Sequence, residues 1–246
     1  MRNGRSVVLK ITRQPGDEWH SGEVIRAFDG DGVVRVYESG EGAVLLERIQ
    51  PCNELVELVR RGDDDTATEL LAQVIHQMSD HKAPAFCPTI NDWASGFDRY
   101  LDSRDKRIPT SLVNETRELY RGLAQSQRTS MLLHGDLHHY NVLFDEQRGW
   151  VAIDPKGLVG ELEYEVGAIL RNPIENSDLL TSPETIRRRL DLLVPSLKLD
   201  YQRTVAWSYA QVVLSAIWQI EDGGEIGYDN SALRLAHALR KVMDNS

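Results

Sequence analysis

Three polar residues between positions 136 and 154 have the types and spacing needed to hold a metal ion and activate a hydroxyl group. Asp136 lies in a turn between two apolar segments, where a carboxylate can face a cleft. Asn141 follows in the same stretch, and Asp154 ends the next apolar segment, after a turn at residues 147–149. A hairpin of this kind brings Asn141 and Asp154 close together, and carboxylate and amide oxygens are ligands that suit Mg²⁺. Asp136 would then be left to accept the proton of a hydroxyl group.

Short apolar segments and helical periodicities predict the elements that position these side chains. Strands are predicted at residues 6–11, 33–38 and 43–47, and again at residues 131–133, 141–144 and 150–153 around the polar cluster. Helices are predicted over residues 17–28, 54–61, 65–81, 93–100 and 109–126, and for most of the chain after residue 161. This order predicts an α+β fold with a small β-rich lobe at residues 1–49 and a larger helical lobe at residues 50–246.

The composition restricts the classes of partner. The 246 residues include 28 Lys and Arg against 38 Asp and Glu, which gives a formal net charge of −10. This acidity argues against nucleic acid and is compatible with a cationic small molecule. Cys52 and Cys87 are too few for a four-cysteine metal site, and a reducing cytoplasm is the expected location. The sequence has neither the apolar core of a secretory signal nor the ~20 apolar residues of a membrane span.

The polar cluster resembles the catalytic loop of the protein-kinase-like fold, H-x-D-x-x-x-x-N followed by a metal-binding Asp. Its full form, H-G-D-L-H-H-Y-N at residues 134–141, is similar to the loop of antibiotic phosphotransferases, choline kinases and homoserine kinases. The motifs I-D-P-K-G at 153–157 and L-R-N-P at 170–173, together with A-W at 206–207, resemble the aminoglycoside/hydroxyurea antibiotic resistance kinases. The resemblance to this group, which includes the streptomycin 6-phosphotransferases, runs from about residue 5 to about residue 243.

The resemblance implies a role for each matching residue in a reaction that uses ATP and Mg²⁺. Asp136 matches the catalytic Asp, Asn141 and Asp154 match the Mg²⁺ ligands, and His134 and His138 match positions that support the loop. Lys10 matches the strand lysine that pairs with the α- and β-phosphates. Its ion-pair partner is best matched by Glu23, with Glu18 as the second choice. Residues 46–49, which include Glu47 and Ile49, match the hinge whose backbone groups would bond the adenine.

Four other residues have both a functional and a structural interpretation. Lys156 follows the metal-binding Asp and could either contact phosphate or serve as a turn residue. Trp218 lies at helical spacing with core residues, so it is either core or a wall of the substrate site. Glu221 and Asp222 end that helix, where acidic groups oppose the helix dipole, so we consider them as binders of a cationic substrate.

The resemblance implies an O-phosphotransferase that acts on a small molecule, with a streptomycin-like aminoglycoside as the acceptor and antibiotic resistance as the outcome. A metabolic kinase of small alcohols or sugars is an alternative. A weakly active or inactive binding protein is another, because Lys10 stands close to the first residue, where the group carries a hairpin that covers the phosphates. The nucleotide-binding lobe is thus expected to be shortened, with an open strand edge that allows a monomer or a homodimer.

Overall fold

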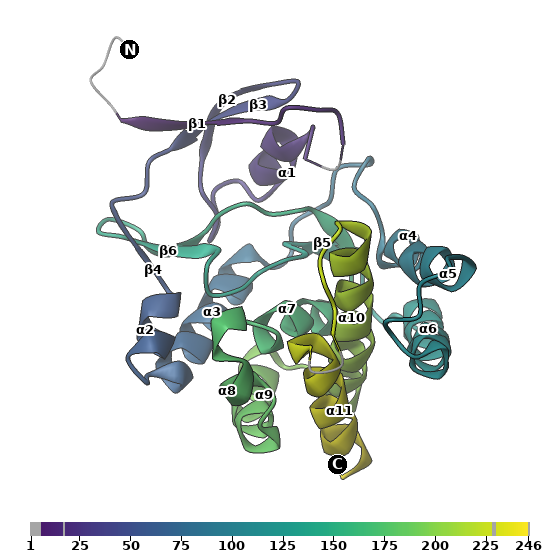
Figure 1. Cartoon of the computed structure of the whole chain (residues 1–246). Coiled ribbons are helices and arrows are strands. Elements are labelled where there is room, and N and C mark those ends of the chain that lie inside the picture. The colour runs from purple at the N-terminus through teal and green to yellow at the C-terminus, as the bar shows by residue number, and fades with distance from the viewer. Residues whose placement is uncertain (1–5, 17, 228–229, 246) are drawn as a thin grey trace. The chain divides into compact units, whose positions relative to one another are not determined.

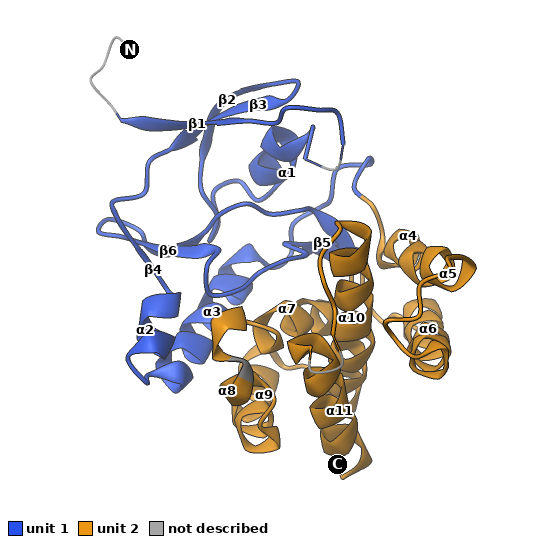
Figure 2. Ribbon diagram, viewed as in Figure 1, with its two compact units in different colours: residues 1–87, 131–159 blue, residues 88–130, 160–246 orange. Residues whose placement is uncertain are grey.

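The computed structural model describes residues 6–16, 18–227 and 230–245, and the chain forms two compact units. Unit 1 comprises residues 1–87 and 131–159, and unit 2 comprises residues 88–130 and 160–246 (Figure 2). The chain contributes to unit 1 twice because a hairpin from residues 131–159 pairs with segments from the N-terminal part. The predicted lobe boundary near residue 49 coincides with none of the three points at which the chain passes from one unit to the other, and it stays a prediction.

The first sheet of unit 1 is antiparallel and has the strand order β1–β3–β2 (Figure 1). Its strands are β1 (Val7–Ile11), β2 (Val36–Gly40) and β3 (Ala43–Glu47). Helix α1 (Ser21–Ala27) packs against β2 and β3 and buries its apolar face in the core of this sheet. The sequence predicts β1 and β3 closely, whereas β2 begins later than predicted. Helix α1 also begins later than the predicted residue 17, and Asp17 lies outside the described residues.

The second sheet of unit 1 has the strand order β4–β6–β7, with β4 (Pro51–Glu54), β6 (Val142–Asp145) and β7 (Gly149–Ala152). The end of β7 is bonded to the loop after α1, because Ala152 N donates to Gly32 O at 2.7 Å and Val34 N donates to Ala152 O at 2.9 Å. Strand β5 (Met131–Leu133) pairs with β8 (Leu158–Gly160). Helices α2 (Val56–Arg60) and α3 (Asp64–Met78) complete the unit. These bonds fix both ends of the hairpin that contains the predicted site.

Unit 2 is built around helix α10 (Tyr201–Glu221), which packs against α6 (Thr110–Gln125), α7 (Val166–Leu170) and α11 (Ser231–Asp244) (Figure 1). The side chains of residues 204–214 are all buried, as expected for a helix at the centre of a helical core. The rings of Tyr120 and Tyr164 meet the Trp207 ring edge-to-face, with centroids 4.9 and 5.2 Å away. The remaining elements are α4 (Ile90–Trp93), α5 (Ser95–Asp102), two short 3₁₀ turns η1 (Leu162–Glu165) and η2 (Ile174–Asn176), α8 (Ser177–Leu180) and α9 (Pro183–Leu197). Among the described residues, no helix combines the length and the apolar character that crossing a bilayer requires.

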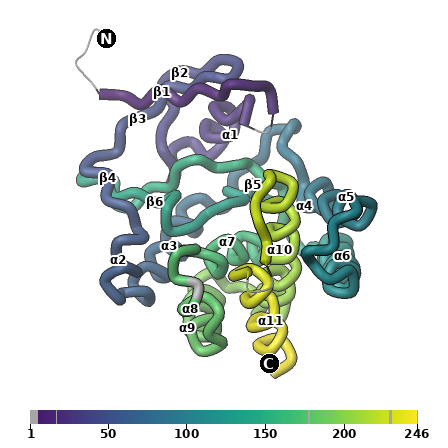
Figure 3. The backbone as a smooth tube through the Cα atoms, in the orientation of Figure 1, coloured from purple at the N-terminus to yellow at the C-terminus, as the bar shows by residue number. Residues whose placement is uncertain are grey.

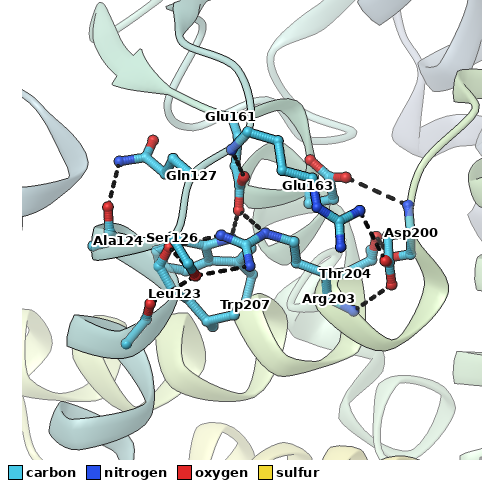
Figure 4. Close-up of polar contacts among 12 residues, drawn as sticks. Leu123, Ala124, Ser126, Gln127, Glu161, Glu163, Asp200, Arg203, Thr204 and Trp207 are labelled. Carbon is cyan, nitrogen blue, oxygen red and sulfur yellow. Dashed lines mark hydrogen bonds and ion pairs between the residues drawn. The ribbon is translucent and has the colours of Figure 1, made fainter.

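A buried polar cluster around Glu161 holds three elements of unit 2 together (Figure 4). The carboxylate, which is 1% exposed, accepts hydrogen bonds from Nε of Arg203 and from Nε1 of Trp207. The guanidinium of Arg203 also donates to Leu123 O at 2.6 Å and to Ser126 Oγ at 3.1 Å. Because the buried charge is both paired and hydrogen-bonded, the cluster links the start of η1 to the end of α6 and to α10 without an uncompensated ion.

Candidate active site

The loop between β5 and β6 is held in place by a neutral, fully buried histidine. His134 Nε2 lies 2.9 Å from the carbonyl oxygen of Ile153, which can only accept, so Nε2 carries the ring proton. Nδ1 then accepts from the backbone N–H of Asp136 at 3.3 Å. Burial lowers the pKa of His134 to about 4, against partial compensation from the hydrogen bond to Ile153. The predicted supporting role of His134 thus has a geometric basis: this ring joins the Asp136 turn to the chain segment that precedes Asp154.

Asp136, His138 and Asn141 lie together inside this loop. Oδ2 of Asp136 is 3.6 Å from Nε2 of His138. Asn141 donates from Nδ2 to the backbone oxygen of Asp136 at 3.0 Å, and its backbone N–H donates to His138 O at 2.9 Å. The loop is therefore closed by its own polar groups, which hold the backbone of Asp136 in place, and the side chain of Asp136 is 28% exposed. A carboxylate that a ligand can reach is suited to accept the proton of an acceptor hydroxyl group.

The backbone positions of Asn141 and Asp154 lie close together at the end of the β6–β7 hairpin, and a shared Mg²⁺ site there stays a prediction. The register of the hairpin pairs Val142 with Ala152, and beyond it the N–H of Ile153 donates to Asn141 O at 2.8 Å. Asp154 follows at once, in a left-handed conformation with φ of 60°. Since Nδ2 of Asn141 is bonded to the loop, its side-chain carbonyl oxygen is the atom that could bind a cation. The hard oxygen donors of Asn141 and Asp154 fit Mg²⁺.

Asp154 belongs to a cluster of four side chains of alternating charge, together with Lys10, Glu18 and Lys156. The ammonium of Lys10 pairs with Asp154 and lies 3.0 Å from Oε2 of Glu18. The ammonium of Lys156 pairs with Glu18 Oε1 and lies 3.9 Å from Oδ2 of Asp154. The four side chains are 26–37% exposed, so ligands can reach them. We call these residues the charge ring.

Within the charge ring, Glu18 and Lys156 shift each other's pKa values. The hydrogen bond from Lys156 is the main cause that lowers the pKa of Glu18, and burial opposes it. Burial lowers the pKa of Lys156, but the carboxylates of Glu18, Asp154 and Asp136 together raise it above its ordinary value. Glu18 and Lys156 are therefore charged at neutral pH, and the ammonium groups of Lys10 and Lys156 both lie within 4 Å of the Asp154 carboxylate.

The structure places Glu18, the second choice from sequence, against Lys10 in the position predicted for Glu23. Glu23 lies in the first turn of α1 with an exposed side chain and is 3.1 Å from the His20 ring. The reason is the late start of α1 at Ser21, which leaves Glu18 in the preceding turn, facing β1, and turns Glu23 outward. In the structure Glu18 lies just before the helix. The sequence periodicity instead assigns this segment to the helix itself, and this concealed the position of Glu18.

The predicted hinge residues lie at the end of β3 and just beyond it. The backbone N–H of Glu47 donates to Arg35 O at 2.9 Å, and its carboxylate accepts from Arg35 N at 2.7 Å and pairs with Arg148. These bonds occupy Glu47 within unit 1, which makes it less suited to bonding an adenine than the sequence suggests. Ile49 is 5% exposed. An adenine contact at Glu47 or Ile49 stays a prediction.

The candidate substrate residues belong to unit 2. Trp218 packs edge-to-face on Trp93 with ring centroids 5.1 Å apart. Glu221 accepts two hydrogen bonds from Arg99, at 2.8 and 3.0 Å, so an internal cation already occupies this carboxylate. Asp222 follows at the C-terminal end of α10. Their part in substrate binding stays a prediction.

Comparison with known proteins identifies relatives that match most of the chain. Residues 1–223 match the model of a family described as aminoglycoside/hydroxyurea antibiotic resistance kinase. The chain is 33% identical over 223 residues to a streptomycin 3''-kinase of Klebsiella pneumoniae, a match that covers 88% of this chain and 80% of the relative. It is 30% identical over 249 residues to a streptomycin 6-kinase of Streptomyces griseus, covering 97% of this chain and 78% of the relative.

Solved structures with similar folds are kinases of small molecules. A choline/ethanolamine kinase family protein of Mesorhizobium loti has a TM-score of 0.66 at 15% identity, with 97% of this chain and 82% of that chain covered. The aminoglycoside phosphotransferase APH(3'')-Id of Streptomyces rimosus, solved with ADP and streptomycin, has a TM-score of 0.59 at 12% identity, with 84% and 86% covered. These likenesses confirm the predicted protein-kinase-like α+β fold. Together with the family match, they lead to one conclusion: the chain belongs to the aminoglycoside/hydroxyurea antibiotic resistance kinase family and is a phosphotransferase.

Proposed function

We propose that the protein transfers the γ-phosphoryl group of ATP to a hydroxyl group of streptomycin or a closely related aminoglycoside. The observation that carries the proposal is the clustering of Asp136, Asn141 and Asp154 at one hairpin, with Lys10 paired to Asp154. Phosphoryl transfer depends mainly on positioning and charge neutralisation, and this cluster offers both. The protein would thereby inactivate the antibiotic inside the cell.

Each side chain has one task in the proposed reaction. Asp136 orients the acceptor hydroxyl and takes its proton as the oxygen bonds to the γ-phosphorus. The bond from that phosphorus to the β–γ bridging oxygen breaks at the same time, and its electron pair stays with ADP. Asn141 and Asp154 would hold Mg²⁺, which supplies positive charge to the β- and γ-phosphate oxygens. Lys10 contributes positive charge from β1.

The choice of acceptor is supported by relatives and by charge. Two relatives that cover most of this chain are named streptomycin kinases, one for the 3''-hydroxyl and one for the 6-hydroxyl. The net charge of −10 favours the approach of a cationic aminoglycoside over an anionic metabolite. The names of the two relatives give different positions of phosphorylation on streptomycin, so the experiment must determine the position for this protein.

The test is ADP release by the purified chain with MgATP and, in separate reactions, streptomycin, hydroxyurea or choline. We expect streptomycin to give the highest kcat/KM, and NMR of the product should assign the phosphorylated hydroxyl. Asp136→Ala and Asp136→Asn should reduce kcat about 100- to 10,000-fold, as for loss of a general base. Asp191→Ala, on the exposed side of α9, is the matched control and should keep the wild-type rate.

Two outcomes would contradict the proposal. Wild-type turnover in Asp136→Ala would remove the carboxylate from the mechanism. Binding of MgATP without phosphorylation of any acceptor would instead favour the inactive binding protein.

A further inference from the structure

Lys156 is anchored by its backbone to the catalytic loop. The N–H groups of Lys156 and Gly157 both donate to the carbonyl oxygen of His134, at 2.8 and 3.2 Å. Gly157 has φ of 74°, and an added Cβ there would lie 2.6 Å from a methyl group of Val24 in α1. The turn is therefore held from both sides, by the loop that contains Asp136 and by α1. A side chain that leaves such a turn has a defined starting position.

The ammonium of Lys156 faces the carboxylates of the site. It pairs with Glu18, lies 3.9 Å from Oδ2 of Asp154, and also experiences the charge of Asp136. Lys10 is paired with the first two of these groups, from β1. Lys156 thus adds a second cation next to Asp154, within electrostatic range of Asp136.

We propose that Lys156 binds the γ-phosphoryl group of ATP and is a catalytic residue alongside Lys10. This inference rests on the proposed function, because it takes Asp136 as the group that holds the acceptor hydroxyl. The attacking oxygen must come within bonding distance of the γ-phosphorus, so a cation that lies next to Asp154 and within electrostatic range of Asp136 is placed to meet the phosphoryl group in transfer. During transfer the acceptor O–P bond forms and the bond to the β–γ bridging oxygen breaks, and Lys156 stabilises the charge on the transferred oxygens without taking a proton.

A purely structural role for Lys156 makes a different prediction. The lysine would then only orient Glu18, which in turn orients Lys10, and its loss would weaken all adenine nucleotides alike. A contact with the γ-phosphoryl group weakens only a nucleotide that carries this group. Comparing a diphosphate with a triphosphate analogue therefore separates the two roles without turnover.

The test is calorimetric binding of ADP and of the unreactive analogue AMP-PNP, each with MgCl2, to wild-type chain and variants. Lys156→Met should raise the Kd of AMP-PNP about 10- to 100-fold, the range for a lost hydrogen bond to a charged group, and leave the Kd of ADP unchanged. Lys156→Gln is the second neutral variant, since its amide can still donate to Glu18, and it should behave like Lys156→Met. Lys156→Arg should keep the preference for AMP-PNP. Lys82→Met, at an exposed position of unit 1, is the matched control.

Activity gives the second readout. With streptomycin, Lys156→Met should lower kcat about 100- to 1,000-fold, with little change in the KM of the acceptor. Equal weakening of ADP and AMP-PNP would overturn the proposal, as would unchanged AMP-PNP binding by the Gln variant. If the wild type phosphorylates no tested acceptor while Lys156→Gln loses AMP-PNP selectively, the Lys156 assignment stands and the acceptor assignment fails. If the wild type binds neither nucleotide, both fail.

Discussion

Acidification should destabilise the protein through His134. The ring is fully buried and neutral, and its pKa is lowered from 6.5 to about 4. A group whose pKa is lower in the folded state than in the unfolded chain gains its proton first in the unfolded chain. Below pH 6.5, proton binding therefore favours unfolding, and the loss of stability continues until the pH nears 4.

The size of this effect follows from the difference in pKa. At 1.36 kcal/mol per pKa unit, the full difference corresponds to about 3 kcal/mol, of which about 2 kcal/mol is lost between pH 7 and pH 5. This is a large share of the 5–15 kcal/mol that typically stabilises a folded domain. His134 alone should thus produce a measurable decrease in the free energy of unfolding between pH 7 and pH 5.

The assay compares urea unfolding of wild type and His134→Gln at pH 7, 6 and 5. Gln can still donate to Ile153 O but takes up no proton, so the variant should be less stable at pH 7 and should lose about 2 kcal/mol less than wild type on going to pH 5. His237→Gln, exposed on α11, is the control and should follow the wild type. Equal pH slopes for wild type and His134→Gln would refute the reasoning.

Two further predictions concern stability and use matched pairs. Arg203→Met leaves the buried Glu161 carboxylate without its cation and should lower the free energy of unfolding by about 3–5 kcal/mol, whereas Asp178→Ala, which breaks an exposed pair, should cost under about 1 kcal/mol in urea titrations. Gly157→Ala adds a contact at 2.6 Å to a positive φ and should cost about 1–3 kcal/mol more than Gly62→Ala, which has a positive φ but open space; equal melting temperatures would contradict the packing argument.

The geometry of the candidate catalytic loop was predictable because its polar residues are close together in the sequence. Asp136 and Asn141 lie in one turn, and a short hairpin leads to Asp154, so spacing alone brings the three together. The strands around them are short apolar runs separated by polar turns. Strand β4 was not predicted, because residues 51–54 are all exposed and contain no apolar alternation; pairing with β6 makes them a strand.

Other contacts depend on distances that sequence periodicity does not encode. The partner of Lys10 depends on where α1 begins, and a shift of its first turn exchanges Glu23 for Glu18. The pairing of Arg203 with Glu161 joins elements far apart in the chain. The sequence near Arg203 or Glu161 does not indicate this pairing. The pairing follows from the packing of unit 2, where a buried carboxylate requires a cation.

The left-handed backbone at Asp154 narrows the residues that can occupy this position. Outside glycine, Asp and Asn are the side chains that adopt φ near 60° most readily, so the backbone and the proposed metal site favour the same few residue types. An alanine here would combine the loss of a ligand with backbone strain, and its phenotype would mix the two. Asn keeps the backbone and removes only the charge, and Gly keeps the backbone and removes the side chain. Comparing the Asn and Gly variants therefore separates the contribution of Asp154 to the backbone conformation from its contribution to cation binding.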